Sequence, residues 1–142
     1  MKHETPADRA KRLAGADPFV VGMGIECLAT DAGQATLRLQ VEPHHLNFMG
    51  ICHGGVIFTL ADTAFGLAAN SYGPVAAGID AHITYQVSVV TGDTLIATTQ
   101  EVSRSSKLAV YRCDVTRQDG VLVSSFTGTV YVTSRRHPDP GH

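Results

Sequence analysis

Residues 54–70 read GGVIFTLADTAFGLAAN, and the pattern in this stretch decides which fold the chain can form. Apolar side chains recur there at steps of three and four residues, which predicts a helix of about 15 to 18 residues. They cover most of the helix circumference, so the helix is expected to be buried rather than laid on a surface. The run NSYGP at residues 70–74 supplies the breakers that end it.

The segments on either side of this helix alternate between apolar and polar residues, as antiparallel strands with one wet face do. Upstream, we expect a short helix within residues 1–16, begun by Thr5-Pro6, and then a hairpin that ends at Glu42. Downstream, we expect a meander of four strands and a frayed tail over residues 134–142. The turns between these strands are predicted at Gly92-Asp93, Arg104–Lys107 and Asp119-Gly120.

A long sheet can bury one apolar helix only by wrapping round it. The sequence therefore predicts a single α+β domain over residues 1–142, with a curled antiparallel sheet of five to six strands around one central helix. A closed five- or six-stranded barrel is the alternative, but a barrel that small has no room for such a helix.

Composition excludes several classes of protein. The formal net charge is -2 and the basic residues are scattered, which is unlike a nucleic-acid-binding surface. No apolar run is long enough to cross a membrane, and the first residues lack the apolar core of a signal peptide. The three cysteines are far apart, as expected for reduced thiols in a cytoplasmic protein.

Asp62 is the residue most out of place, because it lies in the middle of the apolar helix. Burying a carboxylate costs several kcal/mol unless the group is paired or functional, so Asp62 is the leading catalytic candidate. The structural alternative is that Asp62 points out through a narrow polar stripe. That stripe would consist of Thr59, Thr63, Gly66 and Asn70.

His53-Gly54-Gly55 immediately precedes or begins the helix. Glycines at a helix start leave N–H groups open to close approach at the positive end of the dipole, which predicts an oxyanion site. Gly54 and Asp62 are eight residues apart, or about 12 Å along one helix, too far to act on one carbonyl. Two antiparallel helices across a two-fold axis bring them together, so this chemistry requires at least a C2 dimer.

Other polar residues nearby carry weaker signals. Asn47, in the loop upstream, is able to orient a water or a carbonyl, or simply to cap a turn. Cys52 and His53 are adjacent and point to opposite sides of an extended segment, which disfavours a thiolate nucleophile. His44, His45, His53 and His82 match no standard zinc spacing, so no metal is expected.

These residues together resemble the signature of the PaaI-type thioesterases of phenylacetic acid degradation, which belong to the hotdog-fold superfamily. The motif combines an Asn, a His-Gly-Gly and an Asp at fixed spacings, and the resemblance covers nearly the whole chain. The segments that carry it are Leu46-Asn47, His53-Gly54-Gly55, Asp62-Thr63-Ala64-Phe65, Ile83-Thr84-Tyr85, Gly92-Asp93 and Phe126-Thr127-Gly128-Thr129.

The resemblance implies an acyl-CoA thioesterase that acts on aryl- or phenylacetyl-type thioesters, without a cofactor, in a dimer of dimers. Asp62 is similar to the family's nucleophile or general base, and Gly54 to the residue whose backbone N–H, from the facing subunit, polarises the substrate's thioester carbonyl. Asn47 and His53 are similar to the polar pair that positions the carbonyl or water. Gly55, Thr63 and Gly78 fall at expected substrate contacts.

Two departures concern substrate binding. Val87-Ser88-Val89-Val90 stands where relatives commonly have a basic residue and a proline, and Gly78 where some have a hydroxyl residue. Arg104 and Lys107 are candidates for contacts to the CoA phosphates, although ordinary solvated charges are as good an interpretation.

Two rival functions remain. A hotdog hydratase or dehydratase is expected to carry a His five residues after the acid, where this chain has Leu67. A non-catalytic acyl-CoA-binding or regulatory protein would keep the pocket and tolerate the loss of Asp62.

Overall fold

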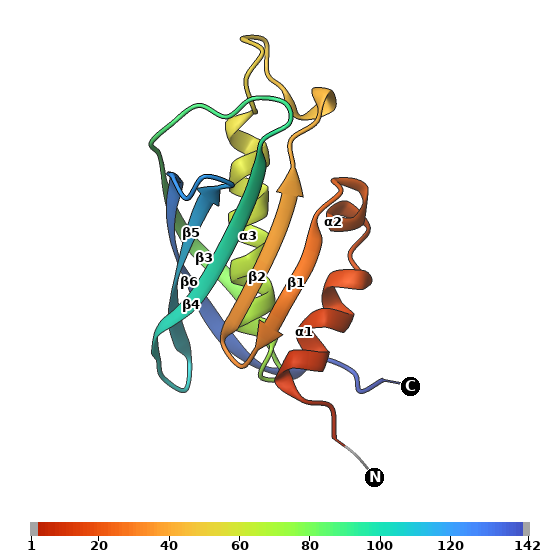
Figure 1. Cartoon of the computed structure of the whole chain (residues 1–142). Helices are drawn as coiled ribbons and strands as arrows, with labels where there is room; N and C mark the ends of the chain where they lie inside the picture. Colours follow the sequence, from red (N-terminus) through yellow and green to blue (C-terminus); the bar gives the residue numbers. More distant parts are fainter. Residues whose placement is uncertain (1–2, 141–142) are drawn as a thin grey trace.

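The computed structural model describes residues 3–140, and its centre is the expected helix, α3, over Gly54–Asn70. The helix lies in the hollow of a curled sheet and contacts five of its strands (Figure 1). The side chains that face the sheet are all but inaccessible to solvent: Ile57, Leu60, Ala61, Ala64, Phe65 and Ala68. Small residues on this face let the sheet approach closely, which explains why one helix can fill the core.

Six antiparallel strands make up the sheet, which confirms the predicted fold class of a hotdog-type sheet wrapped round one helix. Their order across the sheet is β1-β2-β4-β5-β6-β3. Their bounds are Glu26–Asp31 (β1), Gln34–Gln40 (β2), Pro74–Tyr85 (β3), Thr94–Arg104 (β4), Leu108–Arg117 (β5) and Leu122–Arg136 (β6).

The prediction of a four-strand meander is wrong in one respect, because β3 pairs with β6 and β4 pairs with β2. The reason is the connection over residues 86–93, which crosses the N-terminal end of α3 rather than forming a tight turn. The N–H of Cys52 donates to the carbonyl of Val89. The N–H of Gly92 donates to the carbonyl of Val41, and the N–H of Val41 donates to the carbonyl of Asp93, which joins the connection to the end of β2. Strands β3 and β4 are therefore not neighbours in the sheet, and they approach α3 from opposite sides.

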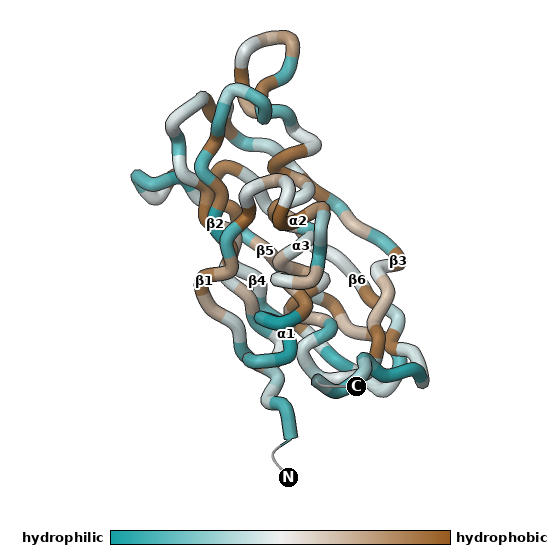
Figure 2. The backbone as a smooth tube through the Cα atoms, turned by 90° about the vertical axis from the view of Figure 1, so that its right-hand side faces the viewer, coloured by the Kyte–Doolittle hydropathy of each residue, from teal (hydrophilic) through white to brown (hydrophobic). Residues whose placement is uncertain are grey.

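Two helices lie across the opening between β1 and β3 (Figure 2). The first, α1 over Pro6–Gly15, begins as predicted, with the Thr5 hydroxyl accepting from the N–H of Asp8 at 3.1 Å. The second, α2 over Pro18–Gly22, lies in a stretch that the sequence reading assigned to a hairpin. Its start repeats the signal of α1, because the Asp17 carboxylate caps the helix and a proline follows.

The expectation of a frayed tail from residue 134 is also wrong. Strand β6 continues to Arg136, which pairs with Pro74, and the N–H of His137 donates to Gly73. Arg12 of α1 then donates to the carbonyl of Pro138. Tertiary contacts to β3 and α1 hold this segment in place, and the sequence of the tail alone does not reveal them; residues 141–142 lie outside the described part.

Phe65 shows how closely the sheet is wrapped. A Cβ atom added at Gly128 of β6 would lie 2.8 Å from the Phe65 ring, and one at Gly78 of β3 would lie 3.3 Å from it. The absence of a side chain at both positions lets the end of the sheet close over the helix. Within residues 3–140, no helix is long and apolar enough to cross a membrane.

Candidate active site

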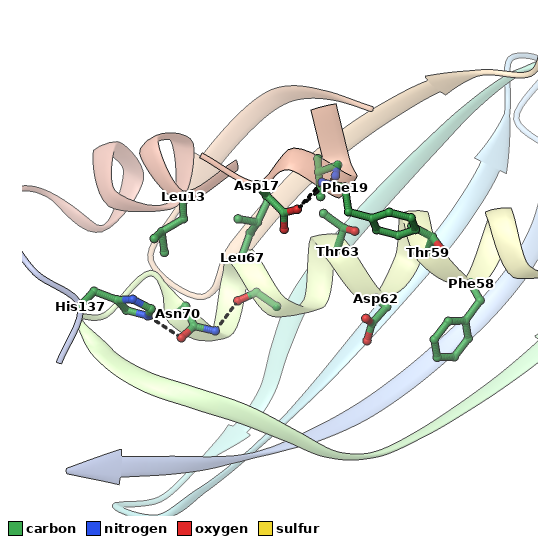
Figure 3. Close-up of a pocket in the computed structure, with 12 residues that line it drawn as sticks. Leu13, Asp17, Phe19, Phe58, Thr59, Asp62, Thr63, Leu67, Asn70 and His137 are labelled. Carbon is green, nitrogen blue, oxygen red and sulfur yellow. Dashed lines mark hydrogen bonds between the residues drawn. The ribbon is translucent and has the colours of Figure 1, made fainter. Parts of the chain in front are cut away.

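Asp62 lies on the side of α3 that the sheet leaves uncovered. It is exposed in the single chain, so the expectation of a buried carboxylate is wrong, and the polar-stripe alternative describes the structure. The stripe residues line one groove of about 450 Å³, which α1, α2 and the tail close on one side (Figure 3). The stripe residues are Thr59, Asp62, Thr63, Gly66 and Asn70.

The Asp62 carboxylate has no hydrogen bond or ion pair with any residue in the described range 3–140. In Figure 3 it lies beside Phe58 on the side of α3 toward β3, whereas Thr63 and Leu67 lie toward α2. The surrounding apolar atoms partly desolvate the carboxylate, which raises its pKa above the usual value. An unpaired acid with a raised pKa is suited to take up a proton, as a general base does.

Gly54 begins α3, and the residues around it leave its N–H unused. The ring Nδ1 of His53, the N-cap, accepts from the N–H of Gly55 at 2.8 Å. The carbonyl of His53 accepts from Val56 and Ile57. Among the described residues no acceptor engages the N–H of Gly54, which therefore stays available to an incoming oxyanion at the positive end of the helix.

His53 acts locally as a cap. Because Nδ1 accepts a hydrogen bond, the neutral ring carries its proton on Nε2, which is free to donate. The ring is exposed, so a substrate group can reach that second nitrogen.

Asn47 and Gly54 line the same cavity, a space of about 250 Å³ that we call the Gly54 cavity. The Asn47 side-chain oxygen accepts from the N–H groups of Met49 and Ile51, which holds the loop over residues 47–51 closed. Its NH₂ group has no partner among the described residues and remains able to donate. Tyr85, at the end of β3, forms another wall of the cavity.

The structure thus brings Asn47, His53 and Gly54 together at one end of α3 and places Asp62 and Thr63 in a separate groove. The two groups are eight residues apart on one rigid helix, or about 12 Å, so a single chain does not unite them.

The remaining predicted contacts lie away from both cavities. Arg104 stacks 3.7 Å from the Tyr72 ring centroid and pairs with Glu101 at 3.7 Å, near the C-terminal end of α3. Lys107 is exposed in the turn between β4 and β5. Gly78 packs against Phe65 rather than lining either space.

The alternative nucleophile and metal ligands do not form a site. Cys52 is buried, which raises the pKa of its thiol to about 11 and disfavours the reactive thiolate. His45 is buried and structural: its ring accepts from the N–H of Glu42 and contacts the carbonyl of Met23. Across residues 3–140, no three His, Cys, Asp or Glu side chains gather as metal ligands would.

Sequence reasoning missed Phe19 and Tyr85. Phe19 lies in the unpredicted α2 and reaches the Asp62 groove, and Tyr85 was read as an ordinary strand residue. The helix start Asp17-Pro18 was a usable signal for the helix that carries Phe19. The position of Tyr85 depends on where β3 ends relative to α3, and the sequence carries no signal for that.

Comparisons with known proteins identify the family of this chain. A family model described as "Thioesterase superfamily" matches residues 49–124, more than half of the chain. A "putative esterase" of Archaeoglobus fulgidus is 40% identical over 106 residues, covering 75% of this chain and 69% of that protein. The "Acyl-coenzyme A thioesterase PaaI" of Escherichia coli is 35% identical over 112 residues, covering 79% and 80%.

Solved structures show the same similarity. The E. coli PaaI protein from the phenylacetic acid degradation operon superimposes with a TM-score of 0.87 at 31% identity, covering 90% of this chain and 93% of that one. A Streptococcus mutans protein solved bound to acetyl CoA has a TM-score of 0.76 at 32% identity, covering 80% and 91%. By its sequence, its hotdog fold and its similarity to the PaaI protein, the chain belongs to the thioesterase superfamily and is a thioester hydrolase.

Proposed function

We propose that this protein is an acyl-CoA thioesterase that cleaves an aryl- or phenylacetyl-type acyl-CoA to the free acid and CoA. The observation that carries the proposal is a pair of groups on α3 that have no partner among residues 3–140: the N–H of Gly54 and the carboxylate of Asp62. The E. coli relative is named an acyl-coenzyme A thioesterase, and the S. mutans neighbour binds acetyl CoA, which supports a CoA ester as substrate.

The active site is completed by a second copy of the chain. Strand β3 is at the edge of the sheet, and its residues 77–82 are exposed on both faces, so its free backbone groups are able to pair with an identical strand. A two-fold axis beside β3 would run two α3 helices antiparallel and set Gly54 of one copy against Asp62 of the other. Two such dimers form the proposed dimer of dimers.

The reaction needs two events at the thioester carbonyl. Asp62 either removes a proton from the attacking water or attacks the carbonyl carbon itself, and both routes remain open. The carbonyl π electrons move onto oxygen, where the N–H of Gly54 stabilises the charge. The tetrahedral intermediate then collapses and the C–S bond breaks. In the general-base route the CoA sulfur takes up the proton that Asp62 removed from water; in the direct route CoA leaves as the thiolate and takes up a proton from the water that later hydrolyses the Asp62 anhydride. We propose that no metal or cofactor takes part.

Two aromatic side chains support an aryl acyl group. Phe58 of α3 and Phe19 of α2 both line the Asp62 groove, and flat apolar rings favour offset or edge contacts with another ring. For the CoA end, Lys107 is the better of the two basic candidates, because Arg104 already pairs with Glu101. Three free cysteines support a reducing, cytoplasmic location.

The test is release of free thiol from phenylacetyl-CoA, its ring-hydroxylated forms and medium-chain acyl-CoAs by the wild type and Asp62→Asn. We expect turnover by the wild type with a preference for the aryl esters, and a loss of about 100-fold or more in Asp62→Asn, as removal of a general base causes. Full turnover by the variant would rule out Asp62 as the catalytic carboxylate. No turnover by either protein, with saturable binding in both, would indicate the non-catalytic acyl-CoA binder.

A further inference from the structure

The start of α3 contains two consecutive glycines, and such a segment needs outside support to hold one conformation. Gly54 and Gly55 lack the side chains that restrict the backbone, so no Cβ on either side restrains the peptide group between them. An oxyanion donor contributes most when its direction is set before the substrate arrives. The N–H of Gly54 belongs to the preceding peptide group, so its direction depends on how the Gly54–Gly55 peptide group is held.

Two side chains hold that peptide group from opposite sides. The ring Nδ1 of His53 accepts from its N–H, on Gly55, at 2.8 Å. The hydroxyl of Tyr85 donates to its carbonyl, on Gly54, at 3.1 Å. Both polar groups of the Gly54–Gly55 peptide are therefore bonded, while the N–H of Gly54 itself remains without a partner among the described residues.

Tyr85 also packs against this turn. Its ring atoms lie 3.4 to 3.5 Å from the position that a Cβ on Gly54 would occupy, so the ring covers the face that glycine leaves bare. The residue is the last of β3 and shares the Gly54 cavity with Asn47. Partial burial raises the pKa of the Tyr85 phenol, which keeps it protonated as a hydrogen-bond donor.

We propose that Tyr85 is a positioning residue for the oxyanion donor: together with His53 it clamps the Gly54–Gly55 peptide and so aims the free N–H of Gly54. The inference rests on the proposed thioesterase reaction but assigns Tyr85 no contact with the reacting atoms. It also links the edge strand β3 to the catalytic turn, because the strand proposed to pair with the second subunit ends in the side chain that holds Gly54.

The experiment compares the full-length wild type with Tyr85→Phe, which keeps the ring and removes only the hydroxyl. Tyr131→Phe is the matched control: its side chain is 43% exposed against 49% for Tyr85, and its hydroxyl has no hydrogen bond among the described residues. Two quantities are measured, kcat and KM for the best acyl-CoA substrate, and the hydrogen exchange of the Gly55 amide by NMR.

We expect Tyr85→Phe to lower kcat by about 3- to 10-fold, the effect of one hydrogen bond, with KM unchanged. The Gly55 amide should exchange faster, because its peptide is freed on the carbonyl side. The control should match the wild type in both. An unchanged kcat, a change in KM alone, or an unchanged Gly55 exchange rate would overturn the positioning role. A wild type without turnover would instead refute the proposed function, and the exchange rate would still decide whether Tyr85 restrains the turn.

Discussion

The two ends of α3 treat their backbone polar groups in opposite ways. At the C-terminal end, the buried guanidinium of Arg9 donates to the carbonyl of Ser71 at 2.6 Å, and the Ser71 hydroxyl donates to Ala68 at 2.7 Å. The side chain of Asn70 bonds Gly66 and both backbone groups of Ala76. At the N-terminal end, the N–H of Gly54 is left without a partner in the described structure.

The difference teaches where this fold is built for stability and where it is built for chemistry. A positive group at the helix C-terminus complements the partial negative charge there, so Arg9 stabilises the folded state directly. At the N-terminus the His53 ring caps only the N–H of Gly55, so the N–H of Gly54 is left for an oxyanion at the positive end of the helix. We therefore expect substitutions at the first end to change stability and those at the second to change turnover.

The largest effect is expected at the N-terminal end of α3, from the substitution Gly54→Pro. Proline is favoured in the first turn of a helix, and the φ of -60° and ψ of 133° at His53 suit the residue before a proline. The substitution removes the N–H while the fold is retained, so kcat should fall by about 100- to 1,000-fold, as for loss of an oxyanion donor. Thiol release measures the rate, and circular dichroism reports the fold.

Gly54→Ala is the control for this change, because it keeps the N–H. Its new Cβ would make ordinary contacts with the Tyr85 ring, no closer than 3.4 Å. Alanine should therefore retain most of the activity. If the alanine and proline variants were equally inactive, the N–H of Gly54 would not be the group that supports turnover. The N-terminal end of α3 would then have no chemical role to set against the stabilising role of the C-terminal end.

At the C-terminal end of α3, the substitution Arg9→Met should lower the stability of the fold rather than turnover. The side chain is buried, pairs with Glu4 at 3.4 Å and bonds the carbonyl of Ser71, so its loss leaves buried groups without a partner. We expect a decrease of about 3 kcal/mol in the free energy of unfolding, measured by urea denaturation.

The control is Lys11→Met, which is also on α1. Lys11 is exposed, so its replacement should leave the free energy of unfolding nearly unchanged. The kcat of folded Arg9→Met should equal that of the wild type, since Arg9, on α1, contacts the C-terminal end of α3 and Gly54 is at the other end. If Arg9→Met were as stable as the wild type, the C-terminal end of α3 would not depend on the Arg9 cation.

The smallest effect concerns pH and compares two acids. The hydrogen bond from Arg12 holds the pKa of Glu4 below its usual value, whereas desolvation raises that of Asp62. Ionised Glu4 therefore stabilises the fold above its unfolded-state pKa, and this contribution is lost as the pH falls through the lower folded-state value. For Asp62 the sign is reversed: its ionisation weakens the fold as the pH rises through the raised pKa.

Unfolding midpoints of Glu4→Gln and Asp62→Asn, each measured against the wild type from about pH 2 to about pH 7, check these signs, because this range extends below the usual carboxyl pKa for Glu4 and above it for Asp62. The deficit of Glu4→Gln should shrink toward acid pH, and Asp62→Asn should gain relative to the wild type as the pH rises. Parallel curves for both variants would mean that neither carboxyl group has a displaced pKa.

Local patterns in the sequence were enough to predict most of the elements, although not α2. The 3.6-residue period of Gly54–Asn70, the Thr5 cap and the Asp119-Gly120 turn each act over a few neighbouring residues, and the structure confirms all three. The separation of Gly54 and Asp62 was also open to prediction, because the geometry of a single helix sets it.

Only the tertiary structure decided how these elements meet. The pairing of β3 with β6, the ordered segment after residue 133 and the Tyr85 hydrogen bond to Gly54 all join residues far apart in the chain. The exposure of Asp62 belongs with them, since it depends on which side of α3 the sheet leaves uncovered. Periodicity records which faces of an element are apolar but not which distant element covers them, because several strand orders bury the same faces equally well.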